Sequence, residues 1–321
     1  MIKFLALLFL RLISKFKLNS NVHNEELIIV LPEKSEGWIL EAIARRIKTH
    51  AEKKIKITSK FNFNKNLKVI LMHYSLLRKY YISGYLLKNV SIFFTHHRSD
   101  LNNNFFEFSY YFKRINKIYL MNSGTKKNSL IKKYAYKTSV CIGGFDPKIF
   151  KLNNSVQNNN VCFVSRFYDR KNPNLIKKII LNNPQFNFYL IGDKWEKYKD
   201  FNELINLSNF YYLNEDYSKY SIIYKKMSFF ISVSHDEGGP IPLLETMACG
   251  IYPIVSNTGF AGDILNRANG SIVDISNKDV DQEISNILKS NKIDRLNLSK
   301  SVEEYSWTKF TKKIIQQINF E

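Results

Sequence analysis

Residues 229–255 read FFISVSHDEGGPIPLLETMACGIYPIV, and this stretch decides the fold. An apolar strand over 229–234 runs into a loop with two glycines. A helix is expected next, because Pro240 and Pro242 suit a first helical turn, where their missing N–H groups would have no intrahelical partner. Gly250 is typical of the residue just beyond a helix, and a second apolar strand follows over 252–255. Strand, helix and strand in this order predict a βαβ unit with parallel strands.

The same stretch predicts a ligand site. Glu237 lies in the loop after the first strand, and Glu245 follows about a turn and a half into the helix. The glycines between them let a ligand approach the backbone, and the helix start offers N–H groups to an anion. Ionised carboxylates only accept hydrogen bonds, which suits the vicinal hydroxyls of a sugar or ribose. We therefore expect a site that binds an anion and a diol.

Strands that alternate with helices continue in both directions along the 321 residues. Such alternation predicts α/β domains with parallel sheets, and the length suits two domains. We expect two Rossmann-like, doubly wound domains that face a cleft, over 1–150 and 151–305, with the polar segment 151–160 as their linker. The expected strands are 27–31, 68–72, 91–94, 117–120, 161–165, 186–191, 210–213, 229–234, 252–255 and 271–273, and the clearest helices are 39–47, 74–87, 173–181 and 281–288.

The run EGGPIPLLETMACG resembles the Glu-x7-Glu motif of the glycosyl transferases group 1 family, whose members are retaining enzymes of the GT-B fold. The resemblance implies that Glu237 contacts hydroxyls of the donor sugar as a catalytic residue and that Glu245 holds the ribose. It also implies that the loop cradles sugar and phosphates through Gly238, Gly239, Pro240 and Ile241. Pro240 stands where the family usually has glycine, so one amide donor is missing.

A second match lies in residues 164–173, VSRFYDRKNP. This segment is similar to the family's Arg- and Lys-bearing loop, whose cations neutralise the donor diphosphate, and it assigns that role to Arg166 and Lys171. Such cations can stabilise charge that develops on a departing diphosphate. Further similarities cover 188–193, 211–217 and 258–263, and residues 306–321 resemble the family's terminal helix, which crosses back to the first domain.

The first domain resembles the family less closely. Gly37, within Glu36-Gly37-Trp38, stands in the usual acceptor-side loop, which here has one glycine. Either His96 or His97 matches the family's histidine that points toward the donor sugar. The sequence does not separate these two neighbours, so both stay candidate catalytic residues.

Positive charge is concentrated in the first half of the chain. The net charge is +20, and residues 1–150 hold 27 Lys and Arg against 9 Asp and Glu. This asymmetry predicts an anionic partner, and we expect a membrane rather than nucleic acid because no nucleic-acid-binding module is recognisable. Residues 1–20 are too short an apolar stretch to span a bilayer and lack a signal-peptide cleavage site. They suit an amphipathic helix on the membrane surface or, equally, one packed on the protein itself.

These observations together predict a retaining glycosyltransferase that moves a sugar from a nucleotide-sugar donor to a glycan or lipid-linked acceptor in surface polysaccharide or lipopolysaccharide assembly. We expect a cytoplasmic protein, peripheral on the inner face of the cell membrane. No cofactor or metal is expected, because Arg166 and Lys171 supply positive charge and no Asp-x-Asp motif is present. Two alternatives stay open: another reaction of the same fold, such as a sugar-nucleotide epimerase or a disaccharide-phosphate synthase or phosphorylase, and a catalytically silent glycan-binding relative.

Overall fold

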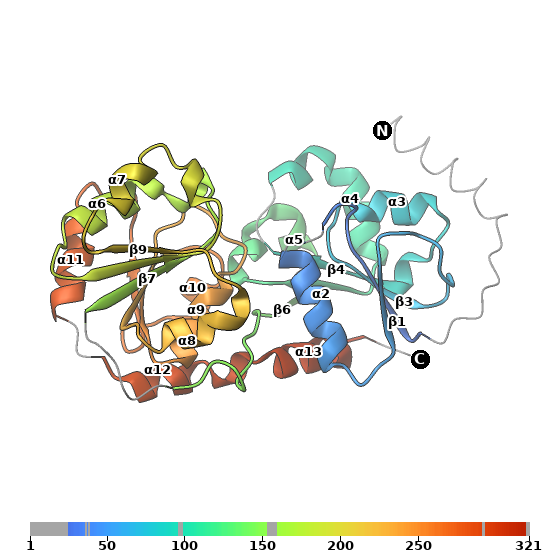
Figure 1. Cartoon of the computed structure of the whole chain (residues 1–321). Coiled ribbons are helices and arrows are strands. Elements are labelled where there is room, and N and C mark those ends of the chain that lie inside the picture. Colours follow the sequence, from blue (N-terminus) through green and yellow to red (C-terminus); the bar gives the residue numbers. More distant parts are fainter. Residues whose placement is uncertain are drawn as a thin grey trace. The chain divides into compact units, whose positions relative to one another are not determined.

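The computed structural model describes residues 25–35, 37, 39–95, 99–152, 159–290 and 293–318. The chain divides into two compact units (Figure 1). Unit 1 comprises Met1–Gly143 together with Trp307–Glu321, and unit 2 comprises Gly144–Ser306. The amphipathic helix expected over 1–20 and most of the expected linker lie outside the described residues.

Unit 1 is built on a parallel sheet with the strand order β2-β1-β3-β4-β5-β6 over its described residues. Every neighbouring pair of these strands is parallel. The chain moves from β1 to β2 on one side and then returns to add β3 through β6 on the other, which is the doubly wound pattern. The strands are β1 Leu27–Val30, β2 Ile55–Thr58, β3 Lys68–Leu71, β4 Val90–Phe94, β5 Lys117–Leu120 and β6 Thr138–Val140.

Helices with one apolar face cover this sheet. Helix α2 (Ile39–His50) buries Leu40, Ile43, Ala44 and Ile47, a spacing that places all four on one side of a helix. The last helix of the chain, α13 (Trp307–Gln316), packs against α2 within unit 1. The other helices of this unit with several turns or a clear cap are α3 Leu76–Ile82, α4 Phe105–Arg114 and α5 Ser129–Lys133.

Two expectations for unit 1 differ from the structure. The expected helix over 74–87 is shorter, because Ser83 ends it and Gly84 follows with a φ of +82°, a left-handed conformation that glycine tolerates. Strand β2 was not predicted at all. It is an edge strand of four residues with lysine at its second position, and only Ile55 is fully buried, so it lacks the apolar run of its neighbours.

Unit 2 repeats the architecture with the order β12-β11-β10-β7-β8-β9 over its described residues. All of its strand pairs are parallel as well. The chain builds β7, β8 and β9 outward on one side and then returns to place β10 beside β7. The strands are β7 Asn160–Val164, β8 Asn187–Ile191, β9 Phe210–Leu213, β10 Phe229–Ser232, β11 Tyr252–Ser256 and β12 Ser271–Val273.

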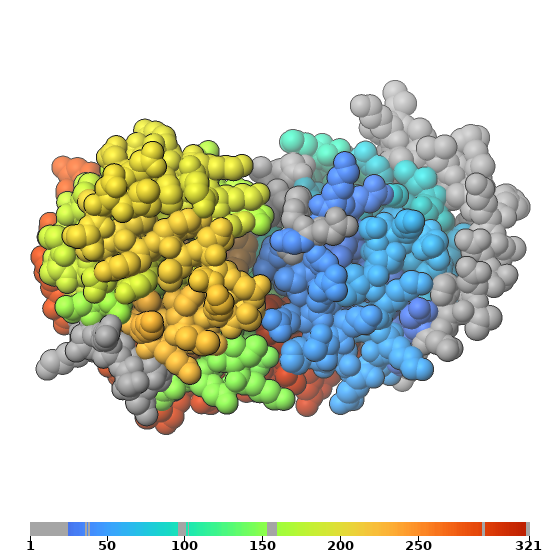
Figure 2. All heavy atoms as spheres, in the orientation of Figure 1, coloured from blue at the N-terminus to red at the C-terminus, as the bar shows by residue number. Residues whose placement is uncertain are grey.

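The helices of unit 2 follow the sequence patterns closely. Helix α6 spans Pro173–Leu181 and begins with proline in its first turn, as predicted. On the face of this unit seen in Figure 2, atoms of the yellow and orange part of the chain cover much of the surface. The remaining helices are α7 Phe201–Ile205, α8 Tyr220–Tyr224, α9 Ile241–Ala248, α10 Ala261–Ile264, α11 Val280–Ser290 and α12 Arg295–Ser301.

Candidate functional site

The candidate site lies at the edge of the unit 2 sheet where the parallel strands end. Strands β7 and β10 are neighbours there, although β8 and β9 separate them in sequence. From β7 the chain continues to β8 on one side of this pair, and from β10 it continues to β11 on the other side. Such a topological switch point is where open α/β sheets bind their ligands.

The loop after β10 carries the decisive motif. Helix α9 begins at Ile241, directly after Pro240, and Pro242 occupies its first turn. The helix ends at Ala248 with Cys249 as its C-cap, and Gly250 follows with a φ of +77°, as predicted, whereas Pro240 stands just before the first helical turn rather than within it. This arrangement places Glu237 in the loop and Glu245 within the helix, as the sequence indicates.

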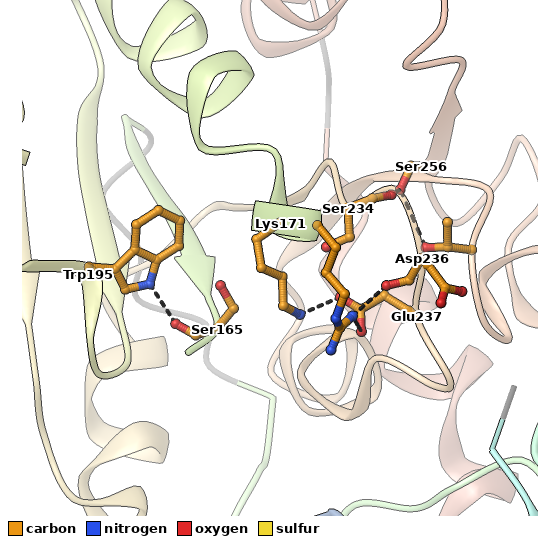
Figure 3. Close-up of polar contacts among 9 residues, drawn as sticks. Ser165, Lys171, Trp195, Ser234, Asp236, Glu237 and Ser256 are labelled. Carbon is orange, nitrogen blue, oxygen red and sulfur yellow. Dashed lines mark hydrogen bonds and ion pairs between the residues drawn. The ribbon is translucent and has the colours of Figure 1, made fainter. Parts of the chain in front are cut away.

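Glu237 is paired with two cations from the loop after β7. Its carboxylate accepts a hydrogen bond from Lys171 Nζ and another, at 3.0 Å, from Arg170 Nη1. The Glu237 side chain is 9% exposed and that of Lys171 14%, so the ion pair is largely shielded from water. Burial raises the pKa of Glu237, but the charges of Lys171 and Arg170 outweigh it, and the pKa lies below its ordinary value of 4.5. Figure 3 shows Lys171 extended toward Glu237.

Arg170 also ties the two loops together through the backbone. Its Nη1 donates to the carbonyl oxygen of Asp236, and its own carbonyl accepts from the amide of His235 at 2.8 Å. Arg170 lies within the segment 164–173 that resembles the family's cationic loop, but the resemblance assigns it no role. The sequence feature that indicates its role is its position directly before Lys171, because two adjacent cations in a short turn can reach the same carboxylate.

Arg166, the other predicted diphosphate ligand, has a different partner. Its Nε donates to both carboxylate oxygens of Asp193, at 2.8 and 3.0 Å, so the two side chains form an ion pair. The hydrogen bond from Arg166 lowers the pKa of Asp193. The loops after β7 and β8 meet closely here, since a Cβ on Gly192 would lie 2.2 Å from the carbonyl oxygen of Ser165. The indole of Trp195 donates to that same oxygen at 2.7 Å (Figure 3).

Glu245 has a hydroxyl-rich environment. Its carboxylate accepts a hydrogen bond from the phenol of Tyr217 and one from Tyr224 at 3.4 Å, and the residue is 1% exposed. Burial, together with the nearby Glu245 charge, raises the pKa of Tyr224 well above its ordinary value, so this phenol keeps its proton and can donate. Residues 211–217 resemble a family segment, but nothing in the sequence connects Tyr217 or Tyr224 with Glu245.

The loop residues between the carboxylates are close to a further segment. A Cβ on Gly259 would meet Gly239 and the ring of Pro240 at about 3 Å, so the 258–263 segment packs on the predicted donor loop. The Ser256 hydroxyl reinforces this edge by donating to the Ser234 carbonyl at 2.6 Å. The described residues of unit 2 therefore bring together Lys171, Glu237 and the loop of Gly238, Gly239, Pro240 and Ile241.

Of the predicted residues in unit 1, only Gly37 can be placed. It has a φ of +74°, and its amide donates to the Glu41 carboxylate at 2.8 Å, which lowers the pKa of Glu41. His96 and His97 lie outside the described residues, as do Glu36 and Trp38. Within the described part of the chain, no helix is long and apolar enough to cross a membrane, and no cluster of three or more potential metal ligands occurs.

Solved structures define the fold class. The chain superposes on the lipopolysaccharide outer core galactosyltransferase WaaB in its apo form with a TM-score of 0.67 and 16% identity, covering 91% of this chain and 98% of that one. It superposes on Alr3699/HepE of Anabaena in complex with UDP with a TM-score of 0.70 and 12% identity, over the same shares. Such identities speak for the fold alone, and the predicted GT-B fold with two Rossmann-like units is confirmed.

Sequence comparison then gives the family. The model of the glycosyl transferases group 1 family matches residues 144–306, which is half of the chain, and the chain belongs to this family. Two Escherichia coli proteins, the O-antigen biosynthesis glycosyltransferase WbnH and the probable O-antigen biosynthesis glycosyltransferase WbiN, are each 27% identical over 158 residues. Each match covers 46% of this chain and 45% of the relative, so the chain matches less than half the length of these curated relatives.

Proposed function

We propose that this chain is a retaining glycosyltransferase that moves a sugar from a nucleotide-sugar donor to a glycan or lipid-linked acceptor in surface polysaccharide or lipopolysaccharide assembly. The observation that carries the proposal is the shielded Lys171–Glu237 pair at the switch point between β7 and β10, in a chain of this family. A cation and a carboxylate held together in this way can bind the phosphate and the hydroxyls of one ligand.

The cations of this edge would bind the donor diphosphate. Lys171 offers a point charge beside Glu237, and Arg166 offers a planar guanidinium that is 41% exposed. As the bond between the anomeric carbon and the diphosphate oxygen breaks, negative charge grows on the diphosphate, and fixed cations stabilise it. The acceptor oxygen forms the new bond to the same carbon, and its proton passes to the departing diphosphate. We expect this chemistry to need no metal.

The two carboxylates would bind hydroxyl groups. Glu237 would contact the donor sugar, and Glu245 would hold the ribose while sharing its carboxylate with Tyr217. Each carboxylate oxygen can accept more than one hydrogen bond, so the hydroxyls of a diol can bind beside the present donors.

The names of similar proteins suggest which donors to test first. HepE of Anabaena has been crystallised with UDP and with UDP-glucose, and the two E. coli relatives are named for O-antigen biosynthesis. UDP-sugars are therefore the first donors to try. The basic first half of the chain supports a location on the cytoplasmic face of the membrane.

Donor binding tests the proposal directly. A panel of UDP-, ADP- and GDP-sugars is screened by thermal shift, since a ligand that binds only the folded protein raises its melting temperature. The best donor is then titrated against Glu245→Ala and Arg166→Ala, with Glu283→Ala and Lys278→Ala as controls at exposed positions on or near α11. We expect at least a tenfold loss of affinity in the first pair only. Unchanged affinity in both would overturn the assignment of the donor site.

The competing reactions are separated by their need for an acceptor. An epimerase consumes or isomerises the nucleotide sugar when no acceptor is present, whereas a transferase needs one for rapid turnover. A silent binding protein would show donor binding without product under any condition. The anomeric configuration of an isolated product, read by NMR, tests retention.

A further inference from the structure

Helix α4 presents an aromatic and basic face to solvent in unit 1. It buries Glu107, Phe108, Tyr111 and Phe112, and it leaves the opposite side outward. Phe106 on that side is 87% exposed, the highest exposed fraction among the large apolar side chains of the described residues. Lys113, seven residues further, lies on the same side of the helix and is also exposed, while the exposed Arg114 lies at the flank of that side, 3.7 Å from the ring centroid of Tyr110.

Helix α5 and the short 3-10 helix after it, η4 (Ala135–Lys137), extend this face. Lys132 and Lys133 are exposed, and Tyr136 is 71% exposed. Contacts join the two helices: Lys133 Nζ lies 5.4 Å from the ring centroid of Phe105 and 3.4 Å from Ser109 Oγ. Figure 1 shows α4 and α5 in the green and teal part of unit 1. We define the α4–α5 face as Phe106, Lys113, Arg114, Lys132, Lys133 and Tyr136.

The positive charge of this face has no acidic counterpart nearby in sequence. Residues 105–137 contain eight Lys and Arg but a single acidic residue, Glu107. That carboxylate is turned inward, where it accepts hydrogen bonds from Arg78 at 2.7 Å and from Tyr111 at 2.9 Å. Lys137 has a structural role, because it donates to the carbonyls of Lys113 and Ile115 at the end of α4. Lys113 and Lys132 are exposed, and Arg114 and Lys133 are exposed cations whose described hydrogen bonds go to the neutral acceptors Tyr110 O and Ser109 Oγ.

We propose that the α4–α5 face binds the surface of an anionic phospholipid bilayer. Lysine and arginine meet lipid phosphates at headgroup level, and the exposed rings of Phe106 and Tyr136 enter the boundary between headgroups and acyl chains. Charge alone would suit any polyanion, but two rings projecting beside the cations suit an interface that is charged outside and apolar beneath. This inference deepens the membrane location that accompanies the proposed function, yet it can fail while donor binding persists.

Vesicle binding tests the proposal on the full chain. Sucrose-loaded vesicles of phosphatidylcholine with about one third phosphatidylglycerol are sedimented with the protein at about 0.15 M salt, and pure phosphatidylcholine vesicles serve as the neutral reference. Reversal of three exposed charges by Lys113→Glu, Lys132→Glu and Lys133→Glu is expected to lower the partition coefficient about a hundredfold. The pair Phe106→Ser and Tyr136→Ser is expected to lower it about tenfold.

The matched control reverses the same charge elsewhere: Lys278→Glu, Lys289→Glu and Lys300→Glu, all exposed in unit 2. All variants keep residues 1–20, so any contribution of that segment is common to them. Circular dichroism and donor binding check that each variant folds. The proposal is overturned if the control loses as much binding as the triple variant, if neither α4–α5 variant loses binding, or if the aromatic pair has no effect. Equal binding to duplex DNA, or a dimer that dissociates in the aromatic variant, would likewise overturn it.

Discussion

Glu237 and Glu245 are eight residues apart and are 9% and 1% exposed, but unit 2 surrounds them differently. Glu237, in a loop, is held by the cations Lys171 and Arg170. Glu245, within α9, is held by the hydroxyls of Tyr217 and Tyr224. A buried carboxylate can thus be stabilised by opposite charge or by neutral hydrogen-bond donors. The two environments should respond differently to mutation and to pH.

The largest expected loss of stability and activity comes from breaking the ion pair of Glu237 with Lys171. Lys171→Ala leaves the buried Glu237 carboxylate with the partly exposed Arg170 as its one ion-pair partner among the described residues. We expect the free energy of unfolding to fall by about 3 kcal/mol, because removing one partner of a buried pair leaves a poorly compensated charge. Urea denaturation measures this, and kcat/KM for sugar transfer should fall at least about a hundredfold.

A second substitution sharpens the Lys171 test. Adding Glu237→Gln to Lys171→Ala removes the stranded charge, so most of the lost stability should return while activity stays low. Lys219→Ala is the matched control, since it breaks an exposed Lys–Glu pair and should change stability by less than about 0.5 kcal/mol. A double variant no more stable than Lys171→Ala would contradict the account.

Loss of a hydroxyl donor to Glu245 should lower the free energy of unfolding by less than loss of Lys171 does. Tyr224→Phe removes one buried donor to Glu245 and keeps the ring, so we expect a loss of about 1–2 kcal/mol in unfolding free energy. Tyr217→Phe should cost less, because Tyr217 is 40% exposed and water can replace its hydroxyl. Chemical denaturation of both variants compares them, and a greater loss in Tyr217→Phe would reverse the assignment.

Substitution of Arg170 tests whether this residue positions Glu237. Its side chain is 44% exposed, so Arg170→Ala should cost only about 1 kcal/mol in stability. We expect a larger effect on kcat than on the donor KM, because Arg170 donates to the Asp236 carbonyl and to the Glu237 carboxylate and so positions the residue proposed to contact the sugar. Arg170→Lys should restore part of kcat, since lysine keeps the charge. Equal losses of kcat in Arg170→Ala and Arg170→Lys would contradict a role of the charge and would leave the geometry of the guanidinium as the cause.

Acid titration gives the smallest and most specific difference. The pKa of Glu237 in the folded protein lies below its ordinary value of 4.5. Its ionised form therefore contributes stability that is fully present above pH 4.5 and is lost as pH falls through the lower, folded pKa. The stability difference between the wild type and Glu237→Gln should be constant above pH 4.5 and shrink below it. A difference that grows on acidification would contradict the ion-pair assignment.

The sequence predicts unit 2 more completely than unit 1, for physical reasons. Strands such as Phe210–Leu213 and Ser271–Val273, and helix Pro173–Leu181, match their predicted bounds because apolar runs and prolines mark them locally. Strand β2 escaped prediction because an edge strand needs few apolar residues. The helix expected over 74–87 is shorter in the structure because Gly84 has a positive φ, a left-handed conformation that the apolar pattern of the sequence does not indicate.

By itself the sequence determined the alternating α/β order, the loop-and-helix motif of Glu237–Glu245 and the one-sided positive charge, because each is a local pattern of residue types. Only the tertiary structure decided the partners. Lys171 and Arg170 meet Glu237 across 66 and 67 residues of chain, and Tyr217 reaches Glu245 across 28. These contacts exist because the chain returns to place β10 beside β7, and no local pattern encodes which distant side chains that return brings together.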